Sequence, residues 1–288
     1  MTAHDPIGAP DAVFRELFVS AEEGVRLRVL HWKPRGETSD APLIFVAGWV
    51  SHVLGWADVL RAAAPNREIC YVETREKTSA AITRPGLRRG DFSIERIAAD
   101  LCAVIPQLPV DASRAVVMAS SLGATAVLEA MKDGGLRPAA AFLIGPNTEF
   151  HAPWYLRWVP FMPLAIYPAI LRFAIWYMRR FRVDSKNEPE QMRRYEETLL
   201  AAHPARLKLS AQAVMRYTVW RGLETIQIPV ALAFADTDKL HGRENIQRLA
   251  NALPRAALVP CPSNKYMHRA DVLDDLTKFL RQHELENR

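Results

Sequence analysis

Ser121 stands in a sequence pattern that suits a serine nucleophile. The apolar run 115–118 predicts a buried strand, and 124–131 predicts a helix that follows it almost directly. So abrupt a strand-to-helix turn leaves room only for small side chains beside its apex. Ala119 and Gly123 meet that need, two residues before and two residues after Ser121. The pattern is typical of a nucleophile elbow, which raises a serine hydroxyl on a strained turn.

The rest of the chain alternates predicted strands with predicted helices. A hairpin within 14–32, turning at Glu22-Glu23-Gly24, precedes unbroken apolar runs at 42–46 and 69–72. Such runs are expected of central parallel strands that are covered on both faces. A capped amphipathic helix from Ser93 and a strand at 139–144 continue the series. This alternation predicts an α/β domain with a parallel sheet built by right-handed crossovers.

The alternation breaks after Gly145. Residues 146–225 contain no clear strand and carry prolines at positions 153, 160, 163 and 168. Strands are predicted again at 229–234 and 256–259, followed by a last helix near 272–280. We therefore expect a core domain of residues 1–145 and 226–288, with 146–225 inserted as a helical cap.

The order of these parts resembles the α/β-hydrolase fold over nearly the whole chain apart from the insert. The resemblance implies a mostly parallel eight-stranded sheet with helices on both faces, the serine elbow after the fifth strand and the cap after the sixth. One departure lies at Ala119, where the family usually has glycine. Another is the segment 73–78, which keeps an arginine of the family's Asp-x-Arg-Gly-x-Gly turn but not its glycines.

The same resemblance implies a Ser-Asp-His triad in that chain order. Asp238 follows the predicted strand 229–234 at the position of the family's acid, and His268 lies before the final helix at the position of its base. A serine hydroxyl needs such a base, whose other ring nitrogen is held by a carboxylate. Asp236 remains a rival acid in the same loop, and Glu149 is a more distant one.

An oxyanion hole would need two backbone donors. The N–H of Leu122 follows the serine at the start of the helix. The family takes its second donor from the loop after the third strand, which points to the N–H of Trp49. That loop reads Ala47-Gly48-Trp49 where the family usually has His-Gly-x.

The insert supplies the prediction about substrate. Residues 154–178 are rich in aromatic and aliphatic side chains, but the longest uncharged run, 158–171, is short and contains prolines. It is therefore not expected to span a bilayer. We expect a lid over an apolar acyl pocket, and its basic amphipathic helix could also lie on an anionic membrane surface. The candidate substrate contacts are Trp154, Trp158, Phe161 and Phe173.

Composition and cysteine usage limit the kinds of protein that the chain could be. With 49% hydrophobic and 24% charged residues the chain is globular, and its net charge of +5 comes without a nucleic-acid motif. The cysteines Cys70, Cys102 and Cys261 lie in apolar surroundings and are expected to be buried free thiols in a reducing compartment. No signal peptide is visible, so we expect a cytoplasmic protein. The sequence shows no metal-ligand spacing and no Gly-rich phosphate loop, so we expect neither metal nor cofactor. The oligomeric state is open.

The predicted function is hydrolysis of a lipophilic carboxylic ester. Two alternatives remain: an acyltransferase that uses the same triad, and a non-catalytic relative that binds a ligand. The changes at Ala47, Ala119 and Glu76 motivate the second alternative.

Overall fold

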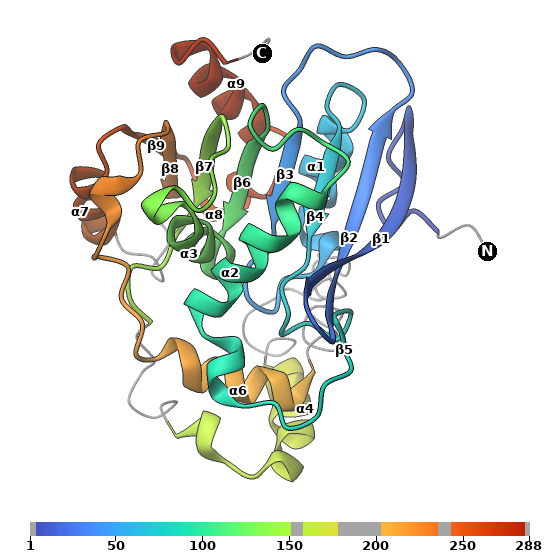
Figure 1. Ribbon diagram of the computed structural model, residues 1–288, viewed down its shortest axis with the longest axis vertical. Helices are drawn as coiled ribbons and strands as arrows, with labels where there is room; N and C mark the ends of the chain where they lie inside the picture. Colours follow the sequence, from blue (N-terminus) through green and yellow to red (C-terminus); the bar gives the residue numbers. More distant parts are fainter. Residues whose placement is uncertain (1–3, 151–157, 178–202, 236–242, 286–288) are drawn as a thin grey trace.

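The structure, a computed structural model, describes residues 4–150, 158–177, 203–235 and 243–285. Within these residues one sheet has the strand order β1-β2-β4-β3-β6-β7-β8-β9 (Figure 1). The antiparallel pairs β1–β2 and β2–β4 lie at one side, and from β4 onward neighbouring strands are parallel. The strands are β1 (Ala12–Glu22), β2 (Val25–Pro34), β3 (Leu43–Val46), β4 (Ile69–Val72), β5 (Ala81–Ile82), β6 (Val116–Ser120), β7 (Ala140–Ile144), β8 (Val230–Ala235) and β9 (Ala256–Cys261). The predicted α/β-hydrolase class is thereby confirmed.

The strand count differs from the prediction by β5. This strand has two residues and pairs antiparallel with Val25 and Arg26 at the start of β2. Two residues carry no periodicity, so the sequence pattern gave no sign of a ninth strand among the described residues.

Helices cover both faces of the sheet. Ile44 and Val46 of β3 belong to the same core cluster as apolar residues of α2, α3 and α7, whereas Leu43 and Phe45 belong to the cluster that includes residues of α1, α8 and α9. This alternation is the period of two that a strand imposes on its side chains. The helices are α1 (Ala57–Ala63), α2 (Ile94–Val104), α3 (Ser121–Met131), α7 (Arg243–Ala252), α8 (Asn264–Met267) and α9 (Val272–Gln282). Short 3₁₀ turns are η1 (Val53–Trp56), η2 (Arg89–Phe92), η3 (Ile105–Gln107), η4 (Lys132–Gly134), η5 (Val159–Phe161), η6 (Leu164–Ile166) and η8 (Leu223–Thr225).

Local signals explain why α2 begins where it does. The Ser93 hydroxyl accepts a hydrogen bond from the N–H of Arg96 at 3.2 Å, as an N-cap should. Ile94, Ile97 and Leu101 recur at helical spacing and are fully buried against the sheet. The predicted cap residue and apolar face of this helix are confirmed.

Between β7 and β8 the described residues form helices. They include α4 (Tyr167–Tyr177) and α6 (Pro204–Val214), which lie together at one end of the molecule (Figure 1). None of the helices in the described part of the chain is long and apolar enough to cross a membrane. The division into a core and a cap at residues 145 and 226 stays a prediction.

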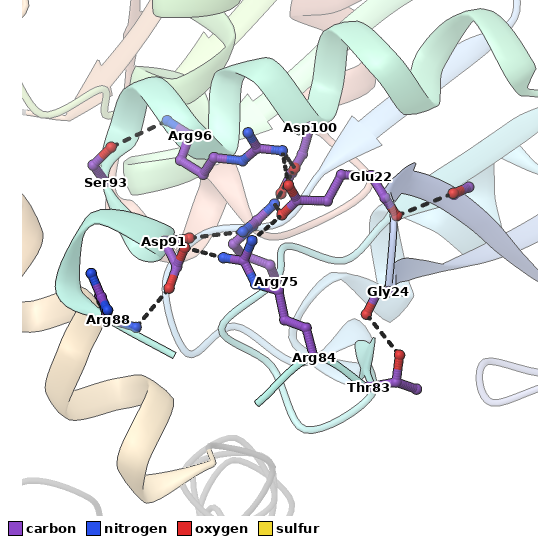
Figure 2. A network of polar contacts seen from close by, with 11 residues as sticks. Glu22, Gly24, Arg75, Thr83, Arg84, Arg88, Asp91, Ser93, Arg96 and Asp100 are labelled. Carbon is purple, nitrogen blue, oxygen red and sulfur yellow. Dashed lines mark hydrogen bonds and ion pairs between the residues drawn. The ribbon is translucent and has the colours of Figure 1, made fainter. Parts of the chain in front are cut away.

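A buried network of charges fixes the loop after β4 (Figure 2). Arg75 is fully buried and binds Asp100 of α2 through two hydrogen bonds. Its guanidinium also donates to Glu22 at 3.0 Å and to the carbonyl of Asp91 at 3.0 Å. Burial raises the pKa of the Asp100 carboxyl, and the hydrogen bonds from Arg75 offset part of that rise. The loop is therefore tied to the end of β1, to η2 and to α2 at once.

Candidate active site

Ser121 occupies the junction between β6 and α3. Its backbone φ is +48°, a left-handed value that is unusual for a residue other than glycine. Two residues later, a Cβ on Gly123 would lie 2.4 Å from the carbonyl oxygen of Ala47 and 2.7 Å from that of Val46. Glycine is therefore needed at 123 so that α3 can begin directly against the end of β3.

Asn147 contacts the hydroxyl of this serine. Its Nδ2 donates to Ser121 Oγ at 3.0 Å, from the loop that follows β7. Its backbone is held by Thr125, whose hydroxyl accepts from the Asn147 N–H at 3.0 Å and donates to its carbonyl at 2.9 Å. Asn147 was not predicted from the sequence. The sequence signal that could have identified it is a polar residue just beyond the carboxyl end of β7, the strand that pairs with β6.

The two segments proposed for the oxyanion hole lie against each other. A Cβ on Gly48 would lie 3.0 Å from Ser120 Oγ and 3.5 Å from the Cβ of Ser121. The loop that carries Trp49 therefore packs on the elbow, next to the serine. Leu122 is buried as the second residue of α3, where helix N–H groups lack a partner within the helix.

The loop after β3 contains a strained turn. The N–H of Ser51 donates to the Gly48 carbonyl at 3.1 Å, and Val50 within this turn has a φ of +55°. A left-handed conformation costs a β-branched residue on the order of 1–3 kcal/mol and persists only when surrounding contacts hold it.

Two side chains outside the turn supply such contacts. The indole Nε1 of Trp49 donates to Ser210 Oγ of α6 at 2.9 Å. The ammonium of Lys77 donates to the Gly48 carbonyl at 2.9 Å. The loop is thus held from α6 on one side and from the loop after β4 on the other.

His268 follows α8 and is half-buried. Its ring lies on that of Trp56, with centroids 4.1 Å apart, and Trp56 in turn packs on Phe45 of β3 at 4.7 Å. The Trp56 indole donates to Ser51 Oγ at 3.1 Å. Trp56 therefore connects the histidine with the turn that carries Trp49.

The acid of the predicted triad lies outside the described residues. Asp238 and its rival Asp236 both fall in 236–242. Glu149, the more distant rival, is described, and its Oε1 accepts a hydrogen bond from Trp220 Nε1 at 3.1 Å.

The cysteines are poor candidates for a nucleophile. Burial raises the pKa of Cys70 to about 12, and burial with the nearby charge of Asp275 raises that of Cys261 to about 11. A thiol of such a pKa is almost fully protonated at neutral pH and unreactive. All three cysteines are free, as expected, but Cys102 is only half-buried, which corrects the prediction for that residue.

The aromatic residues predicted to contact substrate are exposed. Trp158 is 72% exposed, Phe161 58% and Phe173 62%, so the structure does not place these three rings in an enclosed pocket. Phe161 ends η5, Phe173 lies on α4, and Trp158 directly precedes η5, and all three side chains face outward there. Trp154 lies outside the described residues.

Comparisons with known proteins agree with this architecture. The chain is similar in structure to an enol-lactonase from Burkholderia xenovorans LB400, with a TM-score of 0.72, 17% identity, and 91% of this chain and 99% of the other covered. An esterase from Thermogutta terrifontis gives a TM-score of 0.68 at 15% identity over 96% and 100% of the two chains. An esterase from Exiguobacterium antarcticum gives 0.67 at 14% identity over 93% and 99%.

At these identities the similarity establishes the fold and leaves the substrate open. A search of curated proteins found no match. A profile described as the alpha/beta hydrolase family matches residues 43–274, and the chain therefore belongs to that family.

Proposed function

We propose that this protein is a serine hydrolase that cleaves carboxylic esters, with Ser121 as its nucleophile. The observation that carries the proposal is the backbone of Ser121 itself, left-handed at the strand-to-helix junction with Gly123 packed against β3. Such strain at a junction is a recurrent mark of a functional site. The Asn147 amide at the serine hydroxyl adds a polar contact that packing alone does not require.

The proposed reaction proceeds through an acyl-enzyme. Ser121 Oγ attacks the ester carbonyl while His268 accepts its proton, and the N–H groups of Leu122 and Trp49 stabilise the resulting oxyanion. His268 then gives the proton to the departing alcohol. Water then attacks the acyl carbonyl while His268 takes a proton from it, the bond from the acyl carbon to Ser121 Oγ breaks, and His268 returns the proton to Oγ as the carboxylic acid leaves. Asp238 is proposed to hold the imidazole and to stabilise its charged form, with Asp236 as the alternative.

The proposed substrate is a lipophilic ester. The support is the exposed apolar surface of the inserted segment, which includes Trp158, Phe161, Phe173 and Trp176. A surface of this kind can guide a hydrophobic substrate toward the serine. Activity should therefore rise from p-nitrophenyl acetate to longer acyl esters, and a preference for acetate would contradict this part of the proposal.

The exposed rings of Phe173 and Trp176, with Arg172 on the same helix α4, would let the segment rest on an anionic membrane surface. Cosedimentation with anionic and zwitterionic vesicles tests this contact. Binding to neither kind would refute it.

Labelling with a fluorophosphonate probe tests the nucleophile. The wild type should form an adduct and Ser121→Ala should not, whereas Ser120→Ala, the neighbouring serine, should still be labelled. Absence of any adduct dependent on Ser121 would refute the hydrolase and favour a binding protein. Product analysis with added alcohol separates hydrolysis from acyl transfer, because a transferase would form the new ester in preference to the free acid.

A further inference from the structure

Lys77 is a buried lysine whose ammonium reaches the loop that carries Trp49. The residue is 6% exposed, and its Nζ lies 2.9 Å from the Gly48 carbonyl oxygen. That oxygen also accepts the N–H of Ser51, so the ammonium binds the acceptor that closes the turn.

Residues of the loop after β4 also hold the ammonium in position. Lys77 Nζ donates to Thr74 Oγ1 at 3.3 Å and to Glu76 Oε1 at 3.3 Å, and the Thr74 hydroxyl donates to Glu76 at 2.7 Å. The carbonyl of Lys77 accepts a hydrogen bond from Arg206 of α6 at 2.7 Å.

The loop that carries these residues is itself anchored at two points. Arg28 binds Glu73 through two hydrogen bonds, of 2.8 and 3.0 Å. Arg75 enters the network with Asp100 and Glu22 (Figure 2). The loop that carries Lys77 is therefore held in place, so Lys77 can in turn hold the Gly48 carbonyl.

We propose that Lys77 is a positioning residue for the oxyanion hole: its ammonium holds the Gly48–Trp49 peptide whose N–H is the proposed second donor. The inference rests on the proposed function. A peptide unit is planar, with its carbonyl and N–H pointing in opposite directions, so fixing the Gly48 oxygen also fixes the Trp49 N–H. A hydrogen bond to the carbonyl also polarises the unit and strengthens its N–H as a donor.

Two features indicate that this contact serves the loop and not only stability. Val50 holds a left-handed conformation in the same turn, and such a conformation needs contacts from outside. The Lys77–Glu76 pair is buried, and Glu76 Oε2 has no hydrogen-bond partner in the described chain. A buried ion pair of this kind contributes little net stability.

Three variants separate positioning from charge balance. Lys77→Met removes the ammonium but keeps the length of the side chain, and Glu76→Gln/Lys77→Met also removes the carboxylate that would otherwise stay buried. Lys132→Met is the matched control, because the Lys132 side chain is similarly buried (11% exposed, against 7% for the side chain of Lys77) and pairs with Glu129, at the far end of α3.

Steady-state kinetics with a p-nitrophenyl ester, thermal unfolding and hydrogen exchange of peptides covering 48–51 are measured for each protein. Lys77→Met and the double variant should lose on the order of 10- to 100-fold in kcat, with a far smaller change in KM, because the donor is displaced but not removed. Exchange at 48–51 should become faster in both, and Lys132→Met should retain kcat.

The outcomes distinguish failure of the role of Lys77 from failure of the proposed hydrolase function. If the wild type is active and the double variant keeps the wild-type kcat, the positioning role of Lys77 is refuted but the proposed function is not. The lysine would then only neutralise Glu76. A wild type without esterase activity or serine labelling would overturn the proposed function and the catalytic role of Lys77 with it. Loss of kcat in a double variant that still unfolds near the wild-type temperature supports the proposal.

Discussion

Replacing Gly123 by alanine tests the geometry of the elbow directly. The added Cβ would lie 2.4 Å from the Ala47 carbonyl oxygen, and ordinary contact begins at 3.4 Å, so α3 and the end of β3 must separate by about 1 Å (3.4 − 2.4). The clash is with backbone, so no side chain can turn away to relieve it. Overpacking of this kind costs about 1–3 kcal/mol of stability.

The shift would act on catalysis as well as on stability. The first residues of α3 carry Ser121 and the N–H of Leu122, and a misplacement near 1 Å can reduce the rate about 100-fold. We therefore expect Gly123→Ala to lose roughly 100-fold in kcat/KM for a p-nitrophenyl ester while remaining folded.

Alanine substitutions at two other glycines serve as comparisons. A Cβ on Gly48 would meet Ser120 Oγ at 3.0 Å, so Gly48→Ala should show a smaller loss than Gly123→Ala. Gly36 is exposed and has open space around it, so Gly36→Ala should match the wild type. Wild-type kcat/KM and unfolding temperature in Gly123→Ala would show that the helix start does not position the reacting groups.

Three further substitutions give separate checks. Asn147→Ala removes the amide bond to the nucleophile hydroxyl, and kcat/KM should fall roughly 2- to 10-fold, as for one neutral hydrogen bond; unchanged steady-state kinetics would exclude a role. Trp49→Phe removes the bond to α6 at Ser210, so thermal unfolding should occur about 2 °C lower, and Ser210→Ala should cost less stability in this variant than in the wild type. Burial alone would raise the pKa of Glu73, but the hydrogen bonds and charge of Arg28 outweigh it and hold that pKa below its ordinary value of 4.5. The carboxylate thus stabilises the fold above pH 4.5 and loses this contribution as pH falls through the lower native value, so urea midpoints of wild type and Glu73→Gln should converge on acidification; a gap independent of pH would contradict this linkage.

The fold was largely readable from local sequence. The strand that ends at Ser120 and the helix that begins at Ser121 were predicted within a few residues, because apolar period and small flanking residues are local properties. β5 was not predicted, since its two residues are placed by pairing with β2.

The polar surroundings of the serine were less predictable. Asn147 and Lys77 reach Ser121 and Gly48 across 26 and 29 residues of chain. No spacing rule marks such contacts, because they arise only when strand ends meet at one edge of the sheet. The segment at 73–78 lacks the glycines of the family's turn, but its sequence did not indicate which carbonyl Lys77 would bind.

The attachment of α6 has a consequence for protein engineering. This helix lies between β7 and β8 in the chain, within the segment predicted to be a cap, yet it bonds both to Trp49 and to the backbone at Lys77. A chimera that exchanged this segment for that of another hydrolase would remove two supports of the Trp49 loop together, whatever its effect on specificity. Recombination of such proteins should therefore keep residues 204–214 with the parent core and vary only the part of the insert that precedes them.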